Sequence, residues 1–491
     1  MSLEKYFEKY RKNVIGINQI FETPYGKKKL IYADWVASGR LYNPIEQIFL
    51  KKIFPFVANT HTETSTTGAT MSIAFAKALE TIKGHVNAND NDAIISAGAG
   101  MTMLVNKFQR ILGLKIHEKF KKQLNIIDKP IVFVTHMEHH SNQTSWHETI
   151  ADVIIIPHTK SGKVDLKKFE QLLEKNKSRK TKIAAITSCS NVTGIITPYY
   201  EIAEKMHNYQ GLCFVDFACS APYIDIDMHP KNKKQYLDAI YFSPHKFLGR
   251  HGSSGVLIFN KKIYRYRIPD SPGGRTVDWT NPWGEHKYVH SIDAREGGGT
   301  PAFLQTIKTS FCIQLKEDMG TQKILKREHE IHDIVWPSLN KITNLHVLAD
   351  NIKDRLGIYS FYIEGAHYNL VVQLLNDRYG IQVRGGCSCA GTYGHILLDV
   401  DKKRSNNITC SIDNGDLSKK PGWIRMSIHP IMSNDEIKFI INAIKEIAEN
   451  HFSWGKEYSY NKKENSFTYK LEGHSNKNIE RVDNWFKTSF S

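Results

Sequence analysis

The sequence predicts an α/β protein with a large domain on a mainly parallel seven-stranded sheet flanked by helices, followed by a smaller α+β domain. Between residues 90 and 260, short apolar runs alternate with amphipathic segments, as in successive βα units. From about residue 330 the pattern becomes a mixture of single helices and strands. With 491 residues, of which 41% are hydrophobic and 24% charged, the chain can bury a large core.

Seven apolar runs are the predicted strands of the large sheet, because each has the length and composition of a buried strand. They are residues 93–96, 131–134, 153–156, 183–186, 212–215, 239–242 and 255–259. We expect the large domain to comprise residues 31–320, after an N-terminal segment of residues 1–30.

The smaller domain is expected over residues 321–450. Its predicted elements are a helix at 324–342, a strand at 357–363, a helix at 366–376 and a final helix at 434–450. Residues 391–422 form a polar, weakly patterned insertion, and residues 451–491 form a basic tail with aromatic residues. The sequence of neither segment indicates its function.

Bulk properties exclude several classes of protein. No stretch approaches the roughly 18 consecutive apolar residues of a membrane-spanning helix, and the first residues lack the apolar core of a signal peptide. A cytoplasmic location is therefore expected.

The seven scattered cysteines indicate a reducing compartment, where a functional cysteine is more often catalytic than part of a disulfide. The net charge of +16 comes from dispersed lysines, which favours a basic surface or an acidic protein partner over nucleic acid.

Polar residues follow the predicted strands at the edge where open parallel sheets bind ligands. Residues 98–102 follow the first strand and precede an apolar helix, so their N–H groups and hydroxyl could hold a phosphate. Ser243, His245 and Thr300 could add contacts. Because the glycines do not complete a G-x-G-x-x-G pattern, a dinucleotide is disfavoured, and a plain tight turn is the alternative interpretation.

Lys246 and Asp216 are the candidate reactive pair. Lys246 follows the sixth strand, where poor solvation and nearby cations would lower its pKa and leave an amine that can form an imine. The alternative is an exposed loop lysine. Asp216 ends a buried run, where a carboxylate is costly unless it meets a cation such as the ring nitrogen of a cofactor. The alternative is a helix cap or a turn.

Several histidines and cysteines raise a metal alternative. They are His136, His139, His140, Cys387, Cys389 and His395. Structural zinc sites leave roughly two to four residues between paired cysteines, whereas a single residue separates these two, so no metal is expected.

The ordered motifs resemble the class V aminotransferase family, of pyridoxal phosphate fold type I, in its cysteine desulfurase-like branch. The motifs are Gly100-Met101-Thr102, Glu138-His139, Asn191-x-x-Gly194, Asp216, Ser243-x-His245-Lys246, Cys389 and Arg425. The resemblance extends from about residue 32 to residue 447. It rests on the order of the motifs at successive strand ends rather than on any single motif.

The resemblance implies an enzyme that carries pyridoxal 5'-phosphate. Lys246 would form the Schiff base, Asp216 would bond the ring nitrogen, and His139 would stack on the ring and assist proton transfers. Asn191 would bond the phenolic oxygen of the cofactor and contribute to the substrate site. The phosphate would be bound by Met101, Thr102, Ser243 and His245, with Thr300 reaching in from the second subunit of a homodimer.

The resemblance also implies the substrate site and the reaction. Arg425 would hold the substrate carboxylate through its planar fork, and His61 lies in a segment that contributes to the site. Cys389, five positions after Arg384 in a Gly-rich loop expected to be mobile, would be the nucleophile rather than Cys387, although either thiol could be inert packing. L-Cysteine would become L-alanine, and the sulfur would remain on the enzyme as a persulfide for a protein acceptor.

Three departures from the common family pattern leave the substrate open. Cys219 stands where glutamine is common, Pro244 occupies a position often held by a small residue, and the insertion at 391–422 could reshape the entrance. The alternatives on the same scaffold are an aminotransferase, a selenocysteine lyase or an epimerase acting on another amino acid. An alternative of another class is a sulfur-relay or binding protein without turnover.

Overall fold

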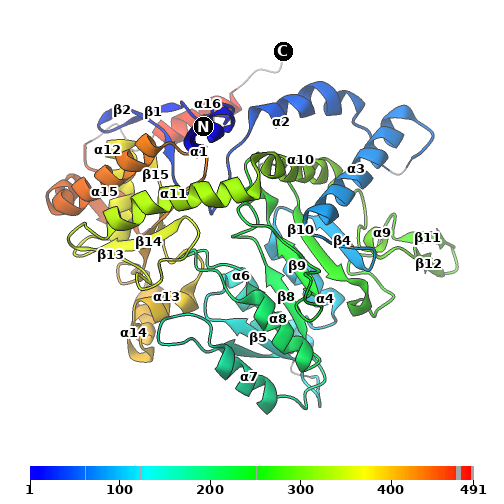
Figure 1. The fold of residues 1–491 in the computed structure, drawn as a ribbon. Helices are drawn as coiled ribbons and strands as arrows, with labels where there is room; N and C mark the ends of the chain where they lie inside the picture. Colours follow the sequence, from blue (N-terminus) through cyan, green and yellow to red (C-terminus); the bar gives the residue numbers. More distant parts are fainter. Residues whose placement is uncertain (61, 122, 250–251, 472–476, 488–491) are drawn as a thin grey trace.

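The computed structural model describes residues 1–60, 62–121, 123–249, 252–471 and 477–487. Two sheets organise the chain, and the long helix α11 (Thr321–Leu339) crosses from the side of the large sheet to that of the small one (Figure 1). The predicted α/β class with a second, smaller α+β region is confirmed. Among the described residues, no helix combines the length and apolar character needed to cross a bilayer.

The large sheet has seven strands in the order β4-β10-β9-β8-β7-β5-β6. The strands are β4 (Asp92–Ala97), β5 (Ile131–Thr135), β6 (Asp152–Ile156), β7 (Lys182–Thr187), β8 (Leu212–Asp216), β9 (Ala239–Phe242) and β10 (Gly255–Asn260). Only β10 runs antiparallel to its neighbours, β4 and β9, whereas the other strand pairs of the sheet are parallel. All seven predicted strands are confirmed.

Both faces of this sheet are buried, which explains why its strands are continuous apolar runs rather than alternating patterns. On β5, Ile131 and Phe133 belong to one hydrophobic cluster and Val132 and Val134 to another. The helices that flank the sheet are α3 (Thr66–His85), α4 (Met101–Ile111), α6 (His140–His147), α7 (Leu166–Lys175), α8 (Tyr199–Asn208) and α10 (Phe303–Met319).

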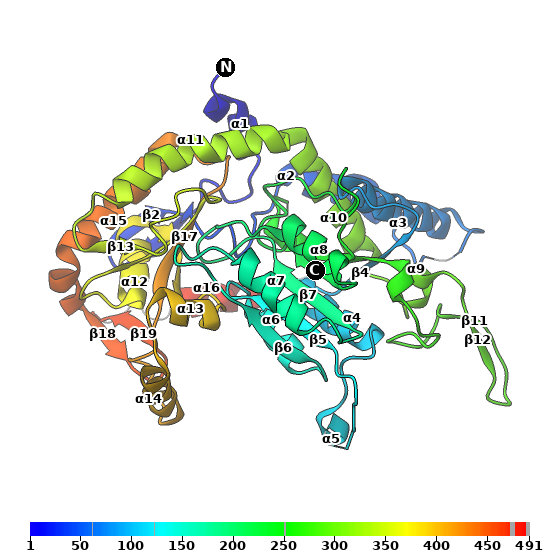
Figure 2. The same ribbon diagram turned by 60° about the horizontal axis from the view of Figure 1, so that its bottom comes forward.

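A narrow hairpin leaves the large domain and extends away from it (Figure 2). It consists of β11 (Val277–Thr280) and β12 (His286–Tyr288) and is followed by the short helix α9 (Ile292–Arg295). Its aromatic side chains are solvent-exposed, with 53% of Trp279 and 83% of Trp283 accessible. The hairpin therefore presents apolar surface that this single chain does not cover.

The smaller sheet has the order β13-β14-β17-β16. Its strands are β13 (Leu345–Val347), β14 (Ile358–Ile363), β16 (Arg384–Gly386) and β17 (Trp423–Ser427), and its helices are α11, α12 (Tyr368–Tyr379) and α15 (Asn434–Trp454). Helix α15 begins at a capping box formed by Ser433 and Glu436. The predicted helices at 324–342, 366–376 and 434–450 correspond to these three, and α11 begins and ends three residues earlier than predicted.

The N-terminal segment joins the smaller domain instead of standing apart. Its elements are α1 (Leu3–Arg11), β1 (Ile20–Thr23) and β2 (Gly26–Lys29), and β3 (Ile31–Tyr32) follows directly. Strand β3 pairs in parallel with β15 (Ile381–Gln382), immediately before the Gly-rich loop. The start of the chain is thereby held beside the loop that carries the cysteines.

The insertion is helical, which its weak pattern did not indicate. It contains α13 (Gly391–Leu397) and α14 (Lys402–Asp413). Helix α14 buries none of its residues, so it carries no apolar stripe from which a helix can be recognised in sequence. An Asp401 side chain that accepts the Arg404 N–H caps its start.

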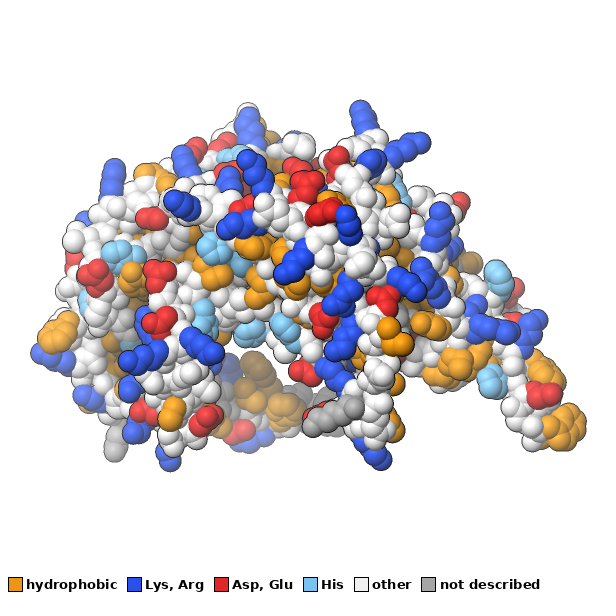
Figure 3. All heavy atoms as spheres, turned by 90° about the horizontal axis from the view of Figure 1, so that it is seen from below, with side chains coloured by type: hydrophobic (Ala, Val, Ile, Leu, Met, Phe, Trp, Pro, Cys, Tyr) orange, Lys and Arg blue, Asp and Glu red, His pale blue; other side chains and the backbone are white. Residues whose placement is uncertain are grey.

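The C-terminal tail begins as a hairpin of β18 (Tyr458–Asn461) and β19 (Ser466–Tyr469), followed by α16 (Lys477–Phe486). The tail is attached to α12, because the Tyr458 hydroxyl donates to Asp377 Oδ2 at 2.9 Å and Arg378 pairs with Glu457 at 2.9 Å. Figure 3 shows lysines and arginines dispersed over the face seen from below, in keeping with the dispersed lysines of the sequence.

Glu138 joins the ends of two strands to a helix. Its buried carboxylate accepts hydrogen bonds from Thr135 Oγ1 at 2.6 Å and the Thr187 N–H at 2.9 Å, and from Asn142 Nδ2 at 2.8 Å. These donors belong to the end of β5, the end of β7 and the first turn of α6. The carboxylate therefore fixes the position of the adjacent residue, His139.

We expect Glu138→Ala to lower the free energy of unfolding by about 3 kcal/mol or more, because each buried donor left unpaired costs roughly 1–3 kcal/mol. Chemical denaturation followed by circular dichroism measures this change. Glu80→Ala on the exposed face of α3 is the control and should alter stability by less than about 0.5 kcal/mol. Equal stability of the two variants would contradict the role given to Glu138.

Candidate active site

A cavity of about 570 Å³ lies at the carboxyl ends of the parallel strands, between the large and small sheets. Thr187 at the end of β7, Asp216 at the end of β8 and Ser243 after β9 line it, as the topology of an open parallel sheet predicts. The predicted site residues that line it are Met101, Thr102, His139, Asn191, Asp216, Ser243, His245, Lys246, Cys389 and Arg425. The structure thus brings ten separate predictions into one cavity.

Two predicted residues are not placed in this cavity. Thr300 is exposed and does not line it, so its contribution to the site of a second subunit stays a prediction. His61 lies outside the described residues.

Lys246 and Asp216 are ionisable groups in a poorly solvated place. Burial lowers the pKa of Lys246, and the negative charges of Cys219 and Asp216 oppose this effect. Burial raises the pKa of Asp216 to about 6, although the Ala218 N–H donates to its Oδ1 at 2.8 Å. Asp216 would gain from a ligand that brings a cationic N–H, and Lys246 can present a neutral amine.

The N-terminus of α4 is arranged to receive an anion. The Met101 N–H donates to Ser243 Oγ at 2.9 Å, and His245 Nδ1 lies 2.8 Å from the carbonyl oxygen of Ala99. A Cβ atom on Gly100 would lie 2.9 Å from the His245 ring, so only glycine permits this close approach. N–H groups, a hydroxyl and an imidazole therefore converge at one helix N-terminus, and a phosphate is the group that they fit.

His139 is a neutral imidazole at the cavity wall. It caps α6, with Nδ1 accepting the Ser141 N–H at 3.1 Å. Burial, together with the charge of Lys246, lowers the pKa of His139 to about 3. The ring therefore adds no charge near neutral pH and can contact a planar ligand.

Asn191 has one satisfied and one unsatisfied side-chain atom. Its Nδ2 donates to the carbonyl oxygen of Ser388 at 2.7 Å. Its Oδ1 is buried and has no hydrogen-bond partner among the described residues. A ligand that brings a donor to this oxygen would remove the cost of leaving it unpaired.

Arg425 is held by a carboxylate that the sequence did not single out. Its Nη2 donates to Asp34 Oδ1 at 2.9 Å, and Arg384 Nε donates to Asp34 Oδ2 at 3.0 Å. Arg425 is buried, and its own Nε has no partner among the described residues. Asp34 therefore orients the arginine while leaving a donor for a further carboxylate. No local motif marks Asp34, because its partners are far away in sequence.

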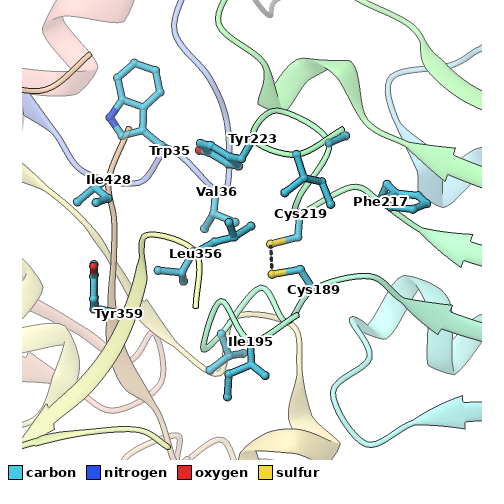
Figure 4. Packing of buried hydrophobic residues seen from close by; sticks show 14 of the residues in the cluster. Trp35, Val36, Cys189, Ile195, Phe217, Cys219, Tyr223, Leu356, Tyr359 and Ile428 are labelled. Carbon is cyan, nitrogen blue, oxygen red and sulfur yellow. Dashed lines mark hydrogen bonds between the residues drawn. The ribbon is translucent and has the colours of Figure 1, made fainter. Parts of the chain in front are cut away.

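Two buried thiols that line the cavity face each other (Figure 4). The sulfur atoms of Cys189 and Cys219 are 3.9 Å apart, and both side chains are buried. Burial raises the pKa of Cys189, whereas the hydrogen bond with Cys189 and the nearby Lys246 lower the pKa of Cys219. Cys219, which stands where the family commonly has glutamine, is therefore a charge partner of Lys246.

The insertion and the tail complete the mouth of the cavity. Leu417 and Lys420 come from the insertion, and Glu464 and Asn465 come from the turn between β18 and β19. Asn465 is anchored on α12, since Asn369 Nδ2 donates to its carbonyl oxygen at 2.6 Å. Sequence reasoning missed these residues because tertiary contacts alone carry them to the site.

The histidines and cysteines considered for a metal do not gather as one ligand set. His136 Nε2 is hydrogen-bonded to the Gly162 carbonyl oxygen at 2.9 Å, and His395 Nε2 lies 2.9 Å from Ser405 Oγ. Within the described ranges, no three His, Cys, Asp or Glu side chains are grouped as metal ligands would be.

Comparisons with known proteins match most of the chain. Residues 31–440 match the family described as aminotransferase class-V. A probable cysteine desulfurase of Halalkalibacterium halodurans is 30% identical over 369 residues, which cover 74% of this chain and 84% of the relative. A probable cysteine desulfurase of Staphylococcus epidermidis is 28% identical over 385 residues, covering 77% of this chain and 87% of the relative.

Solved structures show the same fold. The apo structure of a cysteine desulfurase from Thermococcus onnurineus superposes with a TM-score of 0.71 at 20% identity and covers 90% of this chain and 98% of that one. The cysteine desulfurase CsdA of Escherichia coli gives a TM-score of 0.68 at 18% identity, covering 91% of this chain and 99% of that one.

The raised pKa of Asp216 predicts a pH-dependent cost of folding. The folded protein holds this proton up to a pKa of about 6, whereas the unfolded chain loses it near about 3.9. The stability that the protonated carboxyl contributes is therefore full below about pH 4 and is lost as the pH rises through about 6. Asp216→Asn, which stays neutral, should make the ligand-free protein more stable by about 2–3 kcal/mol at about pH 8.

Chemical denaturation between about pH 4.5 and about pH 8 measures the difference, which should shrink toward the acid end. Asp90→Asn at an exposed loop position is the matched control and should show no pH-dependent gain. A gain for Asp216→Asn that increases as the pH falls would show that burial does not control this carboxyl group.

Proposed function

Because the chain belongs to the class V aminotransferase family, in its cysteine desulfurase-like branch, we propose that it converts L-cysteine to L-alanine and keeps the sulfur on Cys389. The family predicted from the motifs is confirmed. The observation that carries the proposal is the convergence of Lys246, Asp216 and Cys389 on one cavity from two domains.

The residues of the cavity fit pyridoxal phosphate. Lys246 would hold it through an amine whose pKa burial lowers, and Asp216 would receive its ring N–H. The N-terminus of α4, with Ser243 and His245, would receive its phosphate. When bound, the cofactor supplies an electron-withdrawing ring that stabilises negative charge on the substrate Cα.

The chain's own residues would handle the proton and the ring. Lys246 Nζ would accept the proton of the substrate Cα, and burial, which lowers the pKa of this amine, favours the neutral form that the step needs. His139, neutral because burial lowers its pKa to about 3, would contact the ring without adding a competing charge. The buried carboxylate of Asp216 would keep the ring nitrogen protonated.

The substrate carboxylate would be received by Arg425. Its unpaired Nε and its orientation by Asp34 leave a planar donor ready for one further carboxylate oxygen. Cys389 is exposed at the mouth, where its thiolate can attack the substrate sulfur. The carbon–sulfur bond then breaks, alanine leaves, and Cys389 keeps the sulfur as a persulfide.

We further propose a homodimer in the cytoplasm that passes sulfur to a protein acceptor. Exposed Trp279 and Trp283 on the β11–β12 hairpin are large aromatic side chains of the kind that interfaces bury, and Thr300 follows the same segment.

The seven cysteines are all free thiols, which fits a reducing compartment. The charged mouth residues Lys420 and Glu464 support the alternative of a larger amino acid as substrate.

Incubation of the purified protein with L-cysteine should yield alanine and an equal amount of liberated sulfur, counted as protein-bound persulfide plus hydrosulfide. Lys246→Ala should lose the visible absorption of the bound cofactor and form no alanine, because the amine that holds it is gone. Cys389→Ser should keep the absorption but form no persulfide. Cys410→Ser, on exposed α14, is the matched control and should behave as the parent.

Undiminished alanine formation by Lys246→Ala would refute the assignment of Lys246 as the residue that holds the cofactor. Consumption of the amino acid without alanine, persulfide or hydrosulfide would instead point to transamination or epimerisation. A protein that neither binds the cofactor nor consumes the substrate would be a relay or binding protein.

Arg425→Lys should raise KM for L-cysteine at least about tenfold, because loss of a charged hydrogen bond costs roughly 1.5–3 kcal/mol. The effect on kcat should be smaller. Steady-state kinetics measure both, and Arg404→Lys on exposed α14 is the control. An unchanged KM would mean that another group binds the substrate carboxylate.

A further inference from the structure

The Gly-rich loop carries two thiols that face the same cavity. Cys387 and Cys389 are separated by Ser388, and all three residues line the cavity. Cys389 is exposed and Cys387 is half-buried. The function proposed above uses one of these thiols and leaves Cys387 without a role.

Residues 387–390 form a tight turn. The Ala390 N–H donates to the carbonyl oxygen of Cys387 at 3.0 Å. Both central residues are left-handed, with φ of 51° at Ser388 and 56° at Cys389, which is the signature of a type I′ turn. Residues other than glycine pay roughly 1–2 kcal/mol each in this conformation, so the surroundings must hold the turn in place.

Hydrogen bonds from both domains hold it. The carbonyl oxygen of Ser388 accepts from Asn191 Nδ2 at 2.7 Å, and that of Cys389 accepts from the His140 N–H at 2.7 Å. Trp423 Nε1 donates to Ser388 Oγ at 3.2 Å. The loop that the sequence suggested to be mobile is therefore fixed at its backbone, and Cys389 stays beside Cys387.

The turn also sets the separation of the two cysteines. In an extended chain, the Cα atoms of two residues separated by one other residue lie about 7 Å apart. A left-handed helical residue between them shortens this distance, which brings it within the roughly 4.4–6.8 Å that disulfides accept.

We propose that Cys387 is a second catalytic residue, which resolves the persulfide of Cys389 and releases its outer sulfur as hydrosulfide when no protein acceptor takes that sulfur. This proposal rests on the function proposed above. The thiolate of Cys387 attacks Cys389 Sγ and forms a Cys387–Cys389 disulfide. The bond between Cys389 Sγ and the outer sulfur breaks, and that sulfur leaves as HS⁻ with the bonding electrons.

The step balances without an added oxidant. The two cysteine sulfurs together lose two electrons, and the outer sulfur gains them. The proton of the Cys387 thiol is lost when the thiolate forms. A dithiol reductant then returns both cysteines to thiols for the next turnover. An external acceptor, by contrast, must reach Cys389 past Lys420 and Glu464 at the mouth.

A single-turnover experiment tests the proposal. The cofactor-loaded protein is reduced, freed of reductant and mixed anaerobically with less than one equivalent of L-cysteine. The parent should release hydrosulfide in an amount equal to alanine, and its tryptic peptide of residues 385–402 should be two hydrogens lighter than the dithiol form. Cys387→Ser should form as much alanine, release no hydrosulfide and keep one extra sulfur atom on the peptide.

Alanine formation in the first turnover shows that the variant is folded, and Cys387→Ala serves as a second variant. Cys410→Ser, which also lacks one thiol, should match the parent. If the parent keeps the extra sulfur and releases no hydrosulfide, Cys387 does not resolve the persulfide, while the desulfurase function stands. If neither the parent nor any variant forms alanine, the desulfurase function and the role of Cys387 are both wrong.

Discussion

The burial of ionisable groups at the carboxyl edge of the central sheet is the constraint on which the site depends. Asp216 ends a buried strand, where its pKa rises to about 6, and Lys246 lies in the same cavity with a lowered pKa. Each of the two charges is costly there until a ligand supplies its complement. The same burial would, under the proposed function, favour the nucleophilic form of the lysine and make the aspartate a tight partner for a cationic ring.

The substrate end of the cavity is assembled from distant parts of the chain. Asp34, near the N-terminus, joins Arg384 and Arg425 of the smaller sheet, and β3 beside it pairs with β15 just before the cysteine loop. Asn191 and His140 of the large domain hold that loop from the other side. Lys246 and Asp216 therefore come from the large domain alone, whereas the surroundings of Arg425 require both domains to be docked.

Local pattern was enough to predict the strands and the residues that follow them. The seven strands were recoverable because both faces of the sheet are buried and each strand is a continuous apolar run, and Asp216 and Lys246 follow two of them directly. Asp34, Lys420, Glu464 and Asn465 were not recoverable, since their positions depend on contacts across hundreds of residues. Helix α14 was missed for a different reason: it buries nothing, so its sequence carries no periodic signal.

The cavity holds two pairs of thiols that differ in what they can do. Cys189 is buried and its pKa is raised, so it stays protonated and is a poor nucleophile, while Cys219 is a charge partner of Lys246. Cys387 and Cys389 lie at the mouth, one half-buried and one exposed. Under the proposed function, this division would keep sulfur transfer at the entrance and leave the amine of Lys246 to proton transfer. The thiol in place of the family's usual glutamine therefore interacts with the charge of the lysine and opposes the lowering of its pKa by burial.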